Sequence, residues 1–133
     1  MSAAIDLRDD TVQKTDILFP SLRGYNDFTD VPGYENYEIR VKKKQLTQFQ
    51  KVGPSGLLSY PIDGILRNKT TKDEIEFTAD VKRTETSWFV ESVQGKSDKS
   101  RRRLSVLKDP KDMLTKYLEN VTGFAKAEQI MSQ

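Results

Sequence analysis

Residues 74–82 alternate between polar and apolar side chains, and this period of two constrains the fold more than any other feature of the chain. The apolar positions share one side of an extended backbone: Ile75, Phe77, Ala79 and Val81. A strand of this kind buries one face and leaves the other in water. Because such a strand is not stable alone, the sequence predicts neighbouring strands and a cover for the apolar face.

Two segments with similar patterns flank this strand, and short polar turns connect all three. Sequential antiparallel pairing therefore predicts a meander of residues 57–67, 73–83 and 87–94. Pro61 has no backbone N–H to donate, so it favours an edge position or a break in the first strand.

Further strands are predicted on either side of the meander. Residues 37–41 alternate in the same way, and we expect their strand to continue to Phe49, with a bulge where Leu46 falls out of register. Residues 94–101 predict a polar loop, and residues 102–107 predict another short strand.

The clearest helix is predicted over residues 110–122. Asp109 suits the N-cap, Pro110 suits the first helical position, and Gly123 is a stop signal. The apolar residues of this segment follow at helical spacing: Met113, Leu114, Tyr117, Leu118 and Val121. This helix is the natural cover for the apolar face of the sheet.

The elements together predict an α+β fold. It is a curved antiparallel β-sheet, a meander of about three to five strands, covered by a C-terminal α-helix and preceded by an irregular N-terminal segment. Residues 15–124 would form this single α+β domain. Residues 1–14 predict a flexible N-terminus, and residues 125–133 predict a fraying C-terminal tail.

The composition excludes several chemistries. The 133 residues include no Cys and no His, so the chain has no disulfide, no thiolate zinc site and no Ser-His-Asp triad. No glycine-rich phosphate loop or EF-hand spacing occurs. The strand carboxylates Glu74, Glu76 and Asp80 share one face, as on any solvated sheet. The sequence therefore predicts a non-enzymatic protein with no cofactor and no metal, and an enzyme that uses carboxylate, Tyr or Lys chemistry is the less favoured alternative.

Charge is distributed unevenly, although the net charge is only +2. Residues 1–38 hold three basic and eight acidic side chains, a net charge of −5. Residues 39–133 hold 19 basic and 12 acidic side chains, a net charge of +7. Such asymmetry is typical of a polyanion-binding surface, or of an acidic arm that folds onto its own basic surface.

Two clusters hold the candidate binding cations. The first cluster is Lys42, Lys43 and Lys44, and the second is Lys96, Lys99, Arg101, Arg102 and Arg103, extended by Lys108 and Lys111. Such clusters attract phosphate groups or acidic proteins. Trp88 is a candidate for base stacking, and Tyr25 and Tyr34 are candidates for contact with a protein partner. Because Trp88 and Phe89 are neighbours on a strand, one of their rings faces the core.

These observations favour a non-enzymatic interaction or assembly domain that binds a protein partner through its sheet face or its acidic N-terminal segment. The alternative is a nucleic-acid-binding domain for single-stranded DNA or RNA, which would use the basic clusters at 42–44 and 96–111. The sequence does not determine the oligomeric state or the partner's identity.

Other signals concern location and modification. No apolar run approaches the roughly 20 residues of a transmembrane helix, and the first ten residues lack a secretory pattern. An intracellular, cytoplasmic protein is expected, and a targeting peptide removed earlier is compatible with the sequence. The segment Arg102-Arg103-Leu104-Ser105 has the Arg-Arg-x-Ser pattern that basophilic kinases favour, which makes Ser105 a candidate phosphorylation site.

Overall fold

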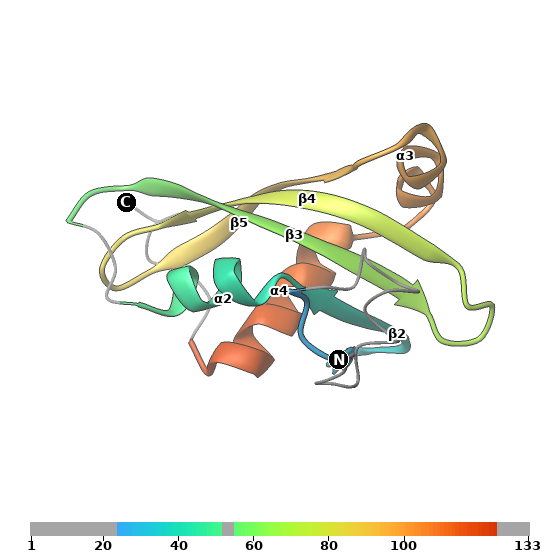
Figure 1. The fold of residues 1–133 in the computed structure, drawn as a ribbon, viewed down its shortest axis with the longest axis horizontal. Coiled ribbons are helices and arrows are strands. Elements are labelled where there is room, and N and C mark those ends of the chain that lie inside the picture. The colour runs from blue at the N-terminus through green and yellow to red at the C-terminus, as the bar shows by residue number, and fades with distance from the viewer. Residues whose placement is uncertain (1–23, 52–54, 125–133) are drawn as a thin grey trace, which may run out of the picture.

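The computed structural model describes residues 24–51 and 55–124. Five antiparallel strands form one open sheet in which each strand pairs with the next along the chain. The strands are β1 (Thr29–Val31), β2 (Tyr34–Val41), β3 (Leu58–Asn68), β4 (Glu74–Arg83) and β5 (Trp88–Gly95). The helices are α2 (Lys43–Gln50), α3 (Asp98–Ser105) and α4 (Pro110–Thr122). The predicted α+β class, meander and C-terminal helix are confirmed (Figure 1).

Helix α4 covers one face of the sheet, beneath β3, β4 and β5 in the view of Figure 1. Its N-cap Asp109 accepts a hydrogen bond from the backbone N–H of Asp112 at 3.1 Å, and Pro110 begins the helix. Gly123 ends it with a φ of 74°, in the left-handed region. The helix contacts both outermost strands, β1 and β5, so the sheet curves around it.

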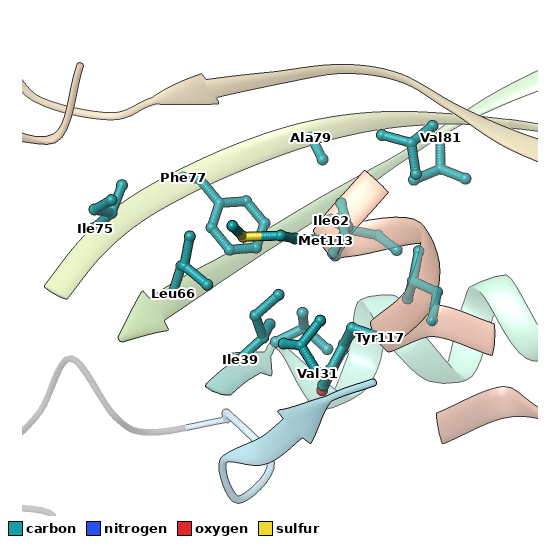
Figure 2. Close-up of a cluster of buried hydrophobic side chains, with 14 of the residues drawn as sticks. Val31, Ile39, Ile62, Leu66, Ile75, Phe77, Ala79, Val81, Met113 and Tyr117 are labelled. Carbon is teal, nitrogen blue, oxygen red and sulfur yellow. The ribbon is translucent and has the colours of Figure 1, made fainter. Parts of the chain in front are cut away.

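The core lies between α4 and the facing side of the sheet, and Figure 2 shows Phe77 of β4 and Met113 of α4 among its side chains. Tyr117 of α4 is fully buried, and its hydroxyl accepts a hydrogen bond from Asn26 Nδ2 at 2.9 Å. The Asn26 backbone N–H donates a hydrogen bond to the Val41 carbonyl at 3.0 Å, and Asn26 Oδ1 accepts one from the Val41 N–H at 2.8 Å. These bonds fix the segment before β1 against both β2 and α4.

The prediction of a strand that continues to Phe49 is wrong, because β2 ends and the chain turns into α2. Leu46 and Phe49 are three residues apart, so they share one face of a helix. Phe49 is fully buried and its ring meets Trp88 with centroids 5.4 Å apart. Gln45 Oε1 accepts a hydrogen bond from the backbone N–H of Asp63 at 2.6 Å, so α2 takes the place of a strand beside β3.

The polar loop and short strand predicted over residues 94–107 are also wrong, because most of this range forms α3. Ser97 caps the helix by accepting a hydrogen bond from the Ser100 N–H at 3.1 Å. Ser100 and Leu104, four residues apart, are buried. Ser100 Oγ also accepts a hydrogen bond from the Glu76 N–H at 3.0 Å, so α3 covers the edge of β4 beyond the end of β5.

The N-terminal part is more regular than predicted. Residues Pro32 and Gly33 form the turn between β1 and β2, where Gly33 has a φ of 85°. Pro61 lies in the part of β3 that extends beyond its pairing with β2, which confirms its edge position. Residues 1–23 and 125–133, which include the predicted flexible ends, lie outside the described residues.

Candidate functional site

Two of the predicted binding cations, one from each cluster, converge on a carboxylate on the sheet face opposite α4. Lys42 Nζ lies 3.8 Å from Asp63 Oδ2, and Lys96 Nζ lies 4.0 Å from Asp63 Oδ1. Burial by itself raises the pKa of Asp63, but hydrogen bonds from Thr78 and Gln45 and the charges of both lysines together lower that pKa. These two lysines therefore compensate the charge of a half-buried carboxylate.

The remainder of this sheet face also carries ion pairs, most of them between neighbouring strands. Arg67 contacts Glu38 at 2.5 Å and Glu74 at 3.7 Å. Lys82 contacts two further carboxylates at 3.3 and 3.2 Å: Asp80 and Glu91. One face of the sheet is thus filled by α4, and the other has much of its charge compensated within the chain.

Two arginines of the second cluster are engaged within the chain. Arg103 Nη2 lies 3.4 Å from Asp73 Oδ1, and its Nη1 donates a hydrogen bond to the Glu74 carbonyl at 2.7 Å. Arg101 pairs with Asp98, three residues earlier on α3. Arg103 therefore holds α3 against the turn between β3 and β4.

Four of the other six cations in the two clusters lie on helices α2 and α3, are exposed, and contact no acidic side chain in the described part of the chain: Lys43, Lys44, Lys99 and Arg102. Helix α2 carries the first two and α3 the last two. These helices lie toward opposite ends of the sheet (Figure 1). The two clusters therefore form separate surfaces instead of one continuous strip.

The three predicted aromatic candidates have different surroundings. Trp88 is only 2% exposed and lies in the core, while Phe89 on the opposite face is half-buried. Tyr25 is half-buried, and burial raises the pKa of its hydroxyl. The Tyr34 hydroxyl donates a hydrogen bond to Asp112 Oδ2 at 2.5 Å. The Trp88 ring is therefore enclosed by the core, and Tyr34 connects β2 to α4.

Replacing Tyr34 with Phe tests this connection. The hydrogen bond to Asp112 raises the pKa of Tyr34 to about 12, above its ordinary value of 10.0. A pKa raised by folding stabilises the folded state below the unfolded pKa, and that contribution is lost as the pH rises through the folded pKa. We expect Tyr34→Phe to lower the free energy of unfolding by about 1 kcal/mol near neutral pH.

This difference should vanish between pH 10 and about pH 12, measured by urea unfolding of both proteins. Tyr37→Phe is the control, because the Tyr37 hydroxyl makes no hydrogen bond within the described residues. A Tyr34→Phe difference that stays constant across this range would contradict the assignment.

A groove that no sequence pattern indicated lies between β5, α3 and the start of α4. Its volume is about 500 Å³, within the range of ligand-binding clefts. Apolar and small residues form much of its lining: Val93, Gly95, Leu104, Leu107 and Pro110. Polar groups come from Gln94, Arg101 and Ser105. The groove thus combines an apolar surface with a few polar groups.

The outer edge of β5, the last strand of the sheet, borders this groove. The Lys96 N–H donates a hydrogen bond to the Glu76 carbonyl at 2.9 Å. This bond shows which residues of β5 direct their backbone groups toward β4: every second residue counted back from Lys96. Because these residues alternate in an antiparallel pair, Val93 and Gly95 direct their backbone N–H and C=O groups away from β4. Within the described residues, no hydrogen-bond partner meets them. Gly95 is buried beneath α3, so an added strand would reach this edge at Val93, which is half-buried.

Positive charge exceeds negative charge around the groove. Five cations of the second cluster remain after the two paired with Asp63 and Asp73: Lys99, Arg101, Arg102, Lys108 and Lys111. The acidic side chains of the same segment and of the neighbouring part of β5 are Glu91, Asp98 and Asp109, so the excess is two positive charges. Lys111 Nζ lies 3.5 Å from the Glu91 carbonyl, which brings one cation to the strand edge itself.

Sequence reasoning missed the groove because its residues come from three elements that only packing brings together, and one of these, α3, was predicted as a loop and a strand. Only Arg101 and Ser105 of its lining were singled out. Gly95 was the available signal, because a glycine at the end of a strand allows another backbone to approach closely. That approach is observed: α3 packs directly on Gly95.

Within residues 24–51 and 55–124, no group of three or more acidic side chains is placed to hold a metal ion. No helix of that part is long and apolar enough to cross a membrane. Comparison of this chain with protein-family models, curated proteins and solved structures gives no match.

Proposed function

We propose that this chain is a non-enzymatic interaction domain that binds an acidic, extended segment of a protein partner along the open edge of β5. The observation that carries the proposal is the backbone of Val93 beside the groove, whose N–H and C=O groups have no hydrogen-bond partner within the described residues. An added strand would exchange hydrogen bonds with these groups. Its side chains would alternate, so every second one would be directed into the groove.

The chemistry of the partner segment follows from the groove's surroundings. Side chains directed inward would be apolar, because Val93, Leu104 and Leu107 line the groove. Side chains at its rim would be acidic, because the local excess is two positive charges. Rim charges of this kind chiefly raise the association rate and the dependence on salt. The segment would therefore alternate acidic and apolar residues.

Selection from a library of displayed random peptides on the full chain tests this proposal. We expect the selected peptides to alternate acidic and apolar residues. Val93→Pro removes an N–H that faces the groove and leaves the ladder with β4 intact, so we expect the fold to be kept. Affinity for a selected peptide, measured by fluorescence anisotropy, should fall by at least about tenfold because strand addition loses a backbone bond. Thermal unfolding checks that the variant is folded.

A pair of charge reversals tests the position of the site. Lys108→Glu, in the segment between α3 and α4, should weaken peptide binding about fivefold and flatten its salt dependence. Lys43→Glu makes the same charge change on α2, toward the other end of the sheet, and should leave binding unchanged (Figure 1). The proposal fails if the selected peptides lack acidic residues, or if Val93→Pro binds them as well as the parent chain does.

The same proteins separate this function from nucleic-acid binding. Single-stranded DNA and RNA oligonucleotides are titrated at about 50 mM salt, where phosphate contacts are strong. We expect binding that is weak in comparison with the selected peptide. Tight binding of oligonucleotides that Lys43→Glu weakens and Val93→Pro leaves unchanged would instead show that the chain binds nucleic acid, which would replace the function proposed here.

A further inference from the structure

Ser105 ends α3 and lines the groove, and it completes the segment Arg102-Arg103-Leu104-Ser105. Its side chain is exposed, and its hydroxyl donates a hydrogen bond to the Arg102 carbonyl at 2.7 Å on its own helix. Val106, the next residue, is 81% exposed. The hydroxyl thus lies at the surface, at the C-terminal end of a helix.

We propose that Ser105 is the acceptor for a protein kinase that recognises basic residues before a serine, and that the phosphate closes the groove to acidic partners. The second part rests on the function proposed above. Ser105 Oγ attacks the γ-phosphorus of a nucleoside triphosphate and forms an O–P bond. The bond from phosphorus to the bridging β-phosphate oxygen breaks, the diphosphate leaves with the electron pair, and a base of the kinase takes the hydroxyl proton.

The two arginines of the segment differ in their contacts. Arg102 is exposed and contacts no acidic side chain in the described part of the chain. Arg103 is bound to Asp73 and to a carbonyl of β4, and Leu104 is buried. A kinase therefore engages the last turn of α3 in a locally opened state. The first turn stays in place because Gly95 packs beneath it.

A phosphate at Ser105 would change the charge of the groove. It adds about two negative charges and three hydrogen-bond acceptors, which cancels the local excess of two positive charges. Arg101 and Arg102, four and three residues earlier on the helix, are on the neighbouring turn. The phosphate would compete with Asp98 for Arg101. An acidic segment would then lose the attraction that the unmodified chain offers.

Phosphorylation of the full chain by a purified basophilic kinase with ATP tests the site, with intact mass and peptide fragmentation as readouts. We expect one phosphate, located at Ser105, and none on Ser105→Ala. Arg102→Ala should lower the initial rate by at least about tenfold, because the kinase loses a charge-assisted contact. Lys99→Ala, which removes a charge from the same helix outside the motif, should leave the rate unchanged. A parent chain without phosphate at Ser105 overturns the proposal.

Binding of a selected acidic peptide to the phosphorylated and unmodified chains tests the regulation. We expect about tenfold weaker binding after phosphorylation, while Ser105→Ala treated with kinase binds like the unmodified chain. Equal affinity of both forms overturns the regulatory part. If the unmodified chain binds no peptide, the proposed function and its regulation fail together, and the mass measurement still decides whether Ser105 is the acceptor.

Discussion

Gly95→Ala is expected to lower the free energy of unfolding by about 3 kcal/mol and to displace α3 from β5. A Cβ atom at Gly95 would lie 2.5 Å from the Arg101 nitrogen and 2.7 Å from the Ser100 carbonyl carbon. Both are backbone atoms, so no side-chain rotation relieves the overlap. The helix must move, and the hydrogen bond from the Glu76 N–H to Ser100 Oγ, 3.0 Å in this structure, would be lost.

Urea unfolding measures the loss, and amide hydrogen exchange of Glu76 reports whether α3 has moved. Gly56→Ala is the matched control, because a Cβ there meets nothing within 4 Å; its stability should stay within about 0.5 kcal/mol of the parent. Since the moved helix forms one wall of the groove, peptide binding should fall as well. Parental stability with unchanged protection of Glu76 would show that the close packing of α3 on β5 is incorrect.

Phe49→Ala should cost about 4 kcal/mol, the usual price of removing a fully buried aromatic ring. The ring is enclosed by three other aromatic side chains, with centroids 5.4 to 6.2 Å away: Tyr60, Trp88 and Phe124. The guanidinium of Arg83 lies 5.0 Å from the ring centroid and donates a hydrogen bond to the Phe49 carbonyl. The substitution therefore leaves a cavity beside a buried cation.

The burial of Arg83 increases this cost. Its side chain contacts no carboxylate among the described residues, and burial lowers its pKa. The Arg83 guanidinium donates hydrogen bonds to the backbone carbonyls of Phe49 and Thr84. It also lies over the aromatic rings of Phe49 and Phe124. Because a buried charge without such contacts is costly, loss of the Phe49 ring weakens support for the guanidinium.

Chemical unfolding and the near-ultraviolet circular dichroism of Trp88 both measure this change. Gln48→Ala, one position earlier on the exposed side of α2, is the control and should change the stability by less than about 0.5 kcal/mol. A loss below about 1 kcal/mol for Phe49→Ala would contradict the enclosed position of this ring.

The parts of the fold that the sequence predicts correctly are those with a strong local signal. The alternation over 74–82 identifies β4, because each apolar residue needs the same buried face. Asp109, Pro110 and Gly123 identify the ends of α4 through the capping needs of its own backbone. Pro61 marks an edge because its missing N–H cannot pair.

The signals failed for α2 and α3, which have eight residues each. A helix this short gains little from its own hydrogen bonds, so it forms because tertiary contacts hold it. For α2 the contact is Phe49 in the aromatic cluster, and for α3 it is the close packing on Gly95 and the bond from Glu76 to Ser100. None of these partners is adjacent in sequence.

For the candidate site too, the sequence predicted the local features and missed those that depend on packing. The sequence identified the cations and the Ser105 motif, because charge and residue order are local properties. It did not show that Lys42 and Lys96 meet at Asp63, or that Trp88 lies in the core while Phe89 faces the other way. Which cations remain exposed depends on which carboxylates the fold places beside them.

By itself, the sequence determined an α+β protein with a meander sheet, a C-terminal helix and an uneven charge distribution. Periodicity, capping residues and composition carry that information because they act over a few neighbouring residues. Only the tertiary structure decided that β5 pairs with no further strand among the described residues, that α3 and α4 form a groove beside it, and that this groove has an excess of positive charge. These features arise where elements distant in sequence meet, so their position depends on packing.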